Sequence, residues 1–161
     1  MTLLEISVVA IIAGVLAAIA TPSMMGILQG QQVNKGLTQI QSTLQTAQQQ
    51  AMRNSKQCQI ILNTTANPPH LSSPNPGCLT SSKIELPGSV AMKTNITDNN
   101  LTFSFKGTLG DPGGTIVVEP KQGRGEKKCL VIARGLGIMR TGIYTGDTTS
   151  SVSATNCTTS K

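Results

Sequence analysis

The sequence predicts an α+β fold, in which a long N-terminal helix packs through its second half on an antiparallel β-sheet while its apolar first half protrudes. Residues 6–20 carry no charge and only one polar side chain. Residues 33–51 repeat apolar positions every three or four residues, which is typical of one buried helix face. Short apolar segments separated by turn residues follow, and they predict strands. We therefore expect three parts, a hydrophobic helix (1–28), an amphipathic helix half (29–56) and a β-rich head (57–161).

The first stretch is apolar for about the 20 residues that a helix needs to cross a bilayer. A cleaved signal peptide begins with basic residues, and this stretch has none. A plain membrane anchor gives no role to Glu5, the one ionisable side chain before Lys35. A third alternative is a helix that leaves the membrane and packs with copies of itself.

The helix is expected to continue to about residue 54. Its apolar stripe comprises Val33, Leu37, Ile40, Leu44, Ala47 and Ala51, and most other positions nearby are Gln. Pro22 removes a helical hydrogen bond and Gly14 has low helix propensity, so we expect a soft segment between these two residues.

The head is expected to contain six strands, at residues 57–62, 82–86, 101–105, 115–119, 129–134 and 138–144. Residues 67–77 hold four prolines and predict a loop. The Ser- and Thr-rich tail after Thr145 is expected to be irregular. An antiparallel sheet built from these strands would cover the apolar stripe of the helix.

The chain has four cysteines, all outside the apolar stretch, and two disulfides are expected in an exported protein. Four cysteines allow three connectivities. We favour Cys58–Cys78 and Cys129–Cys157, because each bridge then clamps a segment with little regular structure. No pair has the close spacing of a zinc site, so no metal is expected.

The N-terminal stretch resembles the type IV pilin family, which includes the pseudopilins of type II secretion. The residues that carry the resemblance are Thr2-Leu3-Leu4-Glu5, the run from Val8 to Ala20, and Pro22, within about 22 of the 161 residues. The resemblance implies a pilin-like fold and a leader peptide that is cut off before Met1. It also implies N-methylation of Met1, although the family usually has Phe there.

The family's mode of assembly assigns roles to Met1, Thr2, Glu5 and Pro22. The Glu5 carboxylate is expected to pair with the N-terminus of a neighbouring subunit and so to set the register between helices. The implied function is that of a structural subunit of a helical type IV pilus, with adhesion and twitching motility as associated functions. The implied partners are copies of the chain, the assembly machinery and, before assembly, the inner membrane, which the chain would span once.

Two alternatives within the family stay open, a minor pilin and a type II secretion pseudopilin. Residues 129–142 resemble the H-type pseudopilins and their relatives in DNA uptake. The formal net charge is +6, and a basic cluster is a candidate for contact with DNA phosphates. Its members are Lys121, Arg124, Lys127, Lys128, Arg134 and Arg140. The alternative for this cluster is a solvated loop.

Nothing in the sequence predicts an enzyme or a cofactor. The single histidine, His70, lies in the proline-rich segment, and the acidic residues of the head show no paired spacing typical of acid–base catalysis.

Overall fold

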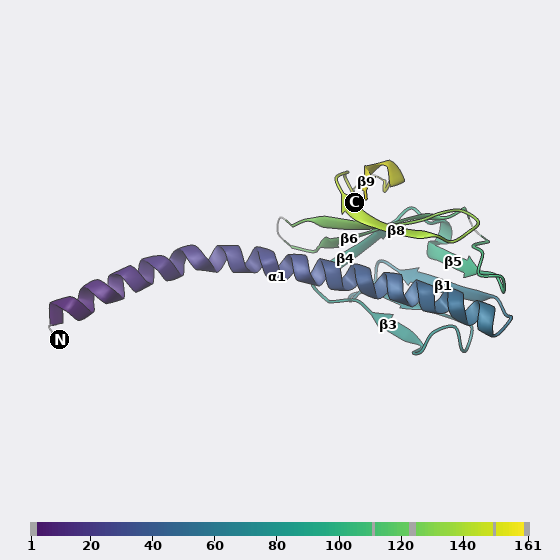
Figure 1. The fold of residues 1–161 in the computed structure, drawn as a ribbon, viewed down its shortest axis with the longest axis horizontal. Coiled ribbons are helices and arrows are strands. Elements are labelled where there is room, and N and C mark those ends of the chain that lie inside the picture. Colours follow the sequence, from purple (N-terminus) through teal and green to yellow (C-terminus); the bar gives the residue numbers. More distant parts are fainter. Residues whose placement is uncertain (1–2, 111, 123–124, 150, 160–161) are drawn as a thin grey trace.

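The fold is described from a computed structural model, which covers residues 3–110, 112–122, 125–149 and 151–159, with backbone alone at 3–4 and 17–25. Helix α1 (Leu3–Arg53) is 51 residues long, and its N-terminal half projects from the head (Figure 1). It ends close to the predicted residue 54, where Ser55 has a φ of 51°. The segment predicted to be soft, between residues 14 and 22, is helical.

The described residues form nine strands in two antiparallel sheets. A four-stranded sheet has the order β3-β2-β1-β5, and a five-stranded sheet has the order β4-β6-β7-β8-β9. The strands are β1 (Cys58–Asn63), β2 (His70–Ser72), β3 (Lys83–Glu85), β4 (Val90–Thr94), β5 (Asn100–Phe103), β6 (Gly114–Pro120), β7 (Lys127–Ile132), β8 (Met139–Tyr144) and β9 (Cys157–Thr158). Two short 3-10 helices, η1 (Thr97–Asn99) and η2 (Ala154–Asn156), complete the described elements.

The predicted fold class, one antiparallel sheet on a helix in a pilin-like arrangement, is wrong. Strand β4 decides the difference, because it pairs with β6 and not with β1 or β5. The strands from β6 onward then extend a second sheet. Three strands lie where none was expected: β2 in the predicted loop, β4 between two predicted strands, and β9 in the predicted irregular tail.

A single core joins α1 to both sheets. The predicted stripe on the second half of α1 is confirmed, since its six residues are all buried: Val33, Leu37, Ile40, Leu44, Ala47 and Ala51. The same cluster includes Ile60 and Leu62 of the four-stranded sheet, and Ile116 and Leu130 of the five-stranded sheet. Gly36 lets the helix come close, because a Cβ there would lie 3.3 Å from Cγ1 of Val118.

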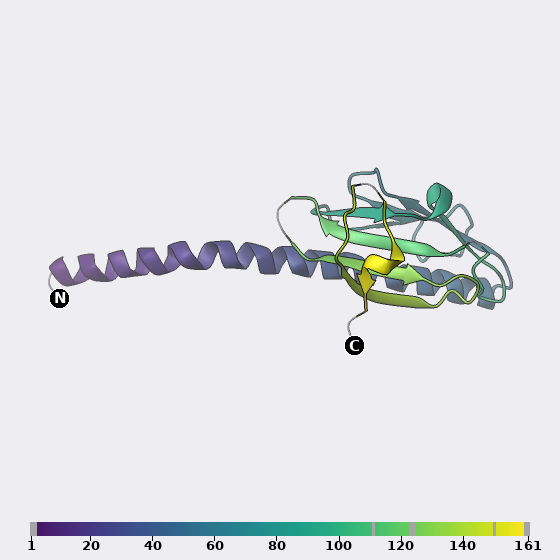
Figure 2. The same cartoon turned by 90° about the horizontal axis from the view of Figure 1, so that it is seen from above.

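A smaller cluster lies on the other face of the five-stranded sheet. It consists of Val117, Cys129, Tyr144 and Val152, with the partly buried Cys157 packed against it. The C-terminal segment that supplies Val152 crosses this face and ends in β9 beside β8 (Figure 2). The chain's own tail therefore covers part of the outer face of the sheet.

Both expected disulfides are present. Cys58 and Cys78 are joined with a Cα–Cα distance of 5.5 Å, and Cys129 and Cys157 with a distance of 5.9 Å. The first links β1 to the proline-rich segment, and the second links β7 to the tail. Because the second closes a long loop, it stabilises the fold by roughly 3–4 kcal/mol in the chain-entropy account.

Replacing Leu44 by Ala tests the central place of the helix in the core. Leu44 is fully buried, and removing such a side chain costs about 2–5 kcal/mol through lost burial and a residual cavity. Urea unfolding of the full chain measures the loss. The control is Gln45→Ala on the exposed side of the same turn, which is expected to change stability by less than about 0.5 kcal/mol. Equal losses in the two variants would contradict the packing described.

Candidate assembly surface

The projecting half of α1 carries large apolar side chains that are exposed. They are Ile6, Val8, Val9, Ile11, Ile12, Val15, Leu16, Ile27 and Leu28, with exposed fractions of 47–67%. The first buried residue of the helix among those whose side chains are described is Val33. The head therefore covers α1 only from about that point onward (Figure 1).

These apolar side chains surround the helix and do not form a single stripe. Successive residues point about 100° apart, so neighbours such as Val8 and Val9, or Ile11 and Ile12, face different directions. A helix that is apolar on all sides is normally buried, either in the core of a large protein or in a membrane. Among the described residues, no helix is both long and apolar enough to cross a membrane.

Glu5 is exposed and lies in the first turn of α1, at one end of a shallow groove. The groove is lined by Glu5, Ile6, Val9, Ala10 and Ala13. The two alanines leave little side-chain bulk along the groove. This side of the helix is therefore open to close approach by another helix.

The proposed partner of Glu5 lies outside the described residues. Met1 and Thr2 belong to that part of the chain, and so does the side chain of Pro22, whose backbone is within α1. Glu5 makes no salt bridge with the residues that are described. The roles assigned to these four residues stay predictions.

The basic cluster is not brought together as one surface. Arg124 lies outside the described residues. Lys121 donates through Nζ to Oδ1 of Asn67 (2.6 Å) and to the carbonyl oxygen of Gly88 (2.8 Å). Lys128 forms an ion pair of 3.1 Å with Glu126. Arg134 follows the end of β7, Arg140 lies in β8 opposite Val131 of β7, and both are exposed. The lysines are thus occupied within the chain.

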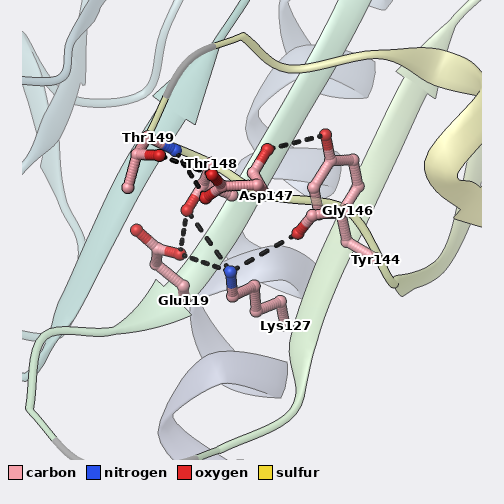
Figure 3. A network of polar contacts seen from close by, with 7 residues as sticks. All are labelled: Glu119, Lys127, Tyr144, Gly146, Asp147, Thr148 and Thr149. Carbon is pink, nitrogen blue, oxygen red and sulfur yellow. Dashed lines mark hydrogen bonds and ion pairs between the residues drawn. The ribbon is translucent and has the colours of Figure 1, made fainter.

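Lys127 holds the tail against the sheet (Figure 3). Its Nζ lies 3.6 Å from Oε2 of Glu119 and donates to Oγ1 of Thr148 (3.4 Å) and to the carbonyl oxygen of Gly146 (3.5 Å). Thr148 in turn donates to Oε2 of Glu119 at 2.7 Å. Since neighbouring strand residues point to opposite faces, Lys127 and Lys128 do not present one binding surface.

This network of polar contacts was not predicted from the sequence, because the network depends on how the strands pair. Val118 lies opposite Lys128 in the β6–β7 register, which places Glu119 close to Lys127. The tail residues Thr148 and Asp147 lie beside the Lys127–Glu119 ion pair, and Thr148 is hydrogen-bonded to it. Asp147 accepts hydrogen bonds from the hydroxyl and the backbone N–H of Thr149, and the side-chain bond is the main reason that the pKa of Asp147 is lowered.

Comparison with known proteins adds no family to these observations, since no protein-family model, curated protein or solved structure matches the chain.

Replacing Thr149 by Val is expected to raise the pKa of Asp147 toward its ordinary value of 3.8, because the hydroxyl donor is lost. Because the pKa of Asp147 is lowered in the folded protein, its ionised carboxylate stabilises the fold at pH values above its ordinary pKa. This contribution is lost as the pH falls through the lowered pKa. An NMR titration of the Asp147 carboxyl carbon measures the change. Thr155→Val, which removes a hydroxyl bonded to Ser153, is the control and should leave the titration unchanged. A titration unaltered by Thr149→Val would contradict the assigned cause.

Proposed function

We propose that this chain is a structural subunit that polymerises into a helical filament of the type IV pilus kind through its N-terminal helix. The observation that supports this most directly is a projecting helix with exposed apolar side chains on all sides and one acidic residue in its first turn. The resemblance of residues 1–22 to the pilin family supports the same function.

Burial of the projecting helix provides the driving force for assembly. Nine large apolar side chains are about half exposed, and burying them in a bundle contributes on the order of 10 kcal/mol at about 25 cal/mol per Å². Association costs roughly 4–15 kcal/mol in lost freedom. The apolar surface is therefore of the right size to drive assembly when each helix contacts several neighbours.

Glu5 fixes the axial register between neighbouring helices, whose apolar surfaces are otherwise uniform. We propose that its carboxylate pairs with the α-amino group of Met1 on a neighbouring subunit, at the open groove beside Ala10 and Ala13. An uncompensated charge buried among apolar helices costs about 3–5 kcal/mol. Helix positions that leave Glu5 without a cation are therefore disfavoured.

The proposal includes a stage in the inner membrane before assembly, with Met1 as the processed and N-methylated first residue. It also includes delivery of the subunit by a pilus or secretion assembly machinery. Mass spectrometry of sheared filaments separates the alternatives. A dominant chain with methylated Met1 supports the major subunit, whereas a trace component supports a minor pilin or a type II secretion pseudopilin.

DNA uptake is the second candidate, and Arg134 and Arg140 are the members of the basic cluster that favour it, since both are exposed. A gel shift with the full chain at low salt tests it. A shift that disappears in the Arg134→Gln/Arg140→Gln variant supports DNA contact. The absence of a shift at any salt concentration rejects it.

Replacing Glu5 by Gln or Ala is expected to lower the yield of filaments by about 100-fold or more, because each subunit then buries an unpaired α-amino group. The unfolding transition of the head should not change. Electron microscopy and sedimentation of the polymer measure the yield. Glu126→Gln, which removes an exposed acid of the head, is the matched control and should assemble normally. Normal filaments from the Glu5 variants would refute the role in register.

A further inference from the structure

The end of the head opposite the projecting helix carries a second group of exposed apolar side chains. They are Met52, Phe105, Leu136 and Ile138, with exposed fractions of 45%, 56%, 68% and 48%. Three chain segments supply them, the end of α1 with the following turn (52–56), the turn after β5 (105–106) and the β7–β8 loop with the first two residues of β8 (134–140). We call these three segments the distal tip.

The three segments lie side by side at this end in both ribbon views (Figures 1 and 2). Gln48 of α1 donates to the carbonyl oxygen of Gly107 at 2.7 Å, and a Cβ at Gly107 would lie 2.7 Å from Sδ of Met52. The backbone N–H of Leu109 donates to the carbonyl oxygen of Gly135 at 2.7 Å. The apolar side chains therefore belong to one continuous surface.

Each segment carries cations as well as apolar side chains. Exposed basic residues of the distal tip are Arg53, Lys56, Lys106, Arg134 and Arg140, and the three segments contain no Asp or Glu. Among the described residues, none of these five cations forms a salt bridge. Lys106 places its Nζ 5.6 Å from the centre of the Phe105 ring.

Ion pairs are found elsewhere on the head. Lys83, Lys127 and Lys128 each have an acidic partner within 4 Å. The positive charge of the distal tip is therefore not compensated within its own segments, in contrast to that of these three lysines. An unpaired group of cations around exposed apolar side chains needs a partner that is both negative and apolar.

We propose that the distal tip binds the surface of a membrane that contains anionic lipids. Phe105, Leu136 and Ile138 enter the boundary between headgroups and acyl chains, while the basic side chains contact lipid phosphates or carboxylates. Apolar side chains with basic side chains around them suit this interface, because the long basic side chains reach back to the headgroups. A fluid lipid surface can also adapt to side chains from three separate segments, so it does not have to match one fixed arrangement of them. The proposal does not depend on filament assembly.

A tryptophan probe at the distal tip tests the proposal on the full chain. The chain contains no tryptophan, so Phe105→Trp reports from this position alone. Vesicles of phosphatidylcholine with about a third phosphatidylserine are expected to shift the emission to the blue, and brominated lipids are expected to quench it. Vesicles of phosphatidylcholine alone should produce a much smaller shift, because basic residues gain affinity only from an anionic surface.

The control probe is Gln122→Trp, an exposed position in the β6–β7 turn at the opposite end of the head. It separates binding by the distal tip from insertion of the projecting helix. Residues 28 to 53 of α1 extend over roughly 37 Å at about 1.5 Å per residue. Insertion of the first half of the helix therefore leaves position 105 in water.

A charge variant tests the electrostatic part of the proposal. With the Phe105→Trp probe in place, Lys106→Gln with Arg134→Gln is expected to weaken partitioning into anionic vesicles by about 30-fold, because each basic residue near such a surface contributes about a fivefold factor. The matched control, Lys83→Gln with Lys128→Gln, removes the same net charge from residues that are paired with acids. It is expected to leave partitioning unchanged.

Several outcomes would overturn the proposal. They are an emission at position 105 that does not respond to anionic vesicles, equal responses at positions 105 and 122, and equal weakening by the two charge variants. A response to single-stranded oligonucleotide without one to vesicles would assign the distal tip to nucleic acid instead. A blue shift that depends on protein concentration in the absence of lipid would assign it to contact between copies of the chain.

Discussion

The buried stripe on the second half of α1 is the contact on which the rest of the head depends. Six small or aliphatic residues of one helix face pack against both sheets. Neither sheet has another α-helix to cover it among the described residues. Gly36 allows the close approach to Val118, so the helix serves as the shared layer of the core. Loss of this stripe would expose the inner faces of both sheets together.

The same helix separates two surfaces of different chemistry. Its first half presents apolar side chains all around and one carboxylate, whereas its C-terminal end meets two loops that present apolar and basic side chains together. A continuous hydrogen-bonded helix holds the two surfaces apart. The proposed filament contact and the proposed lipid contact can therefore be made by one chain without competing for the same residues.

The local sequence pattern was sufficient to predict part of the head. The predicted strands near β1, β3, β5, β6, β7 and β8 exist, since each has apolar residues at alternate or continuous positions between turn residues. Strands β2, β4 and β9 were not predicted. Strand β2 lies within the proline-rich segment, β4 is defined by its pairing with β6, and β9 has only two residues, held next to β8 through Cys157. The residues of the predicted basic cluster do not share one surface for a related reason, since strand pairing decides to which face of the sheet each lysine points.

The sequence by itself determined the long helix, its buried stripe and the exposed apolar half, because these follow from the spacing of residues that are neighbours along the chain. It also favoured the two disulfides through the position of the cysteines. The tertiary structure decided that there are two sheets, that Lys127 binds the tail, and that residues from near positions 52, 105 and 136 form one surface. These features depend on contacts between distant segments, which hydrophobic periodicity does not specify.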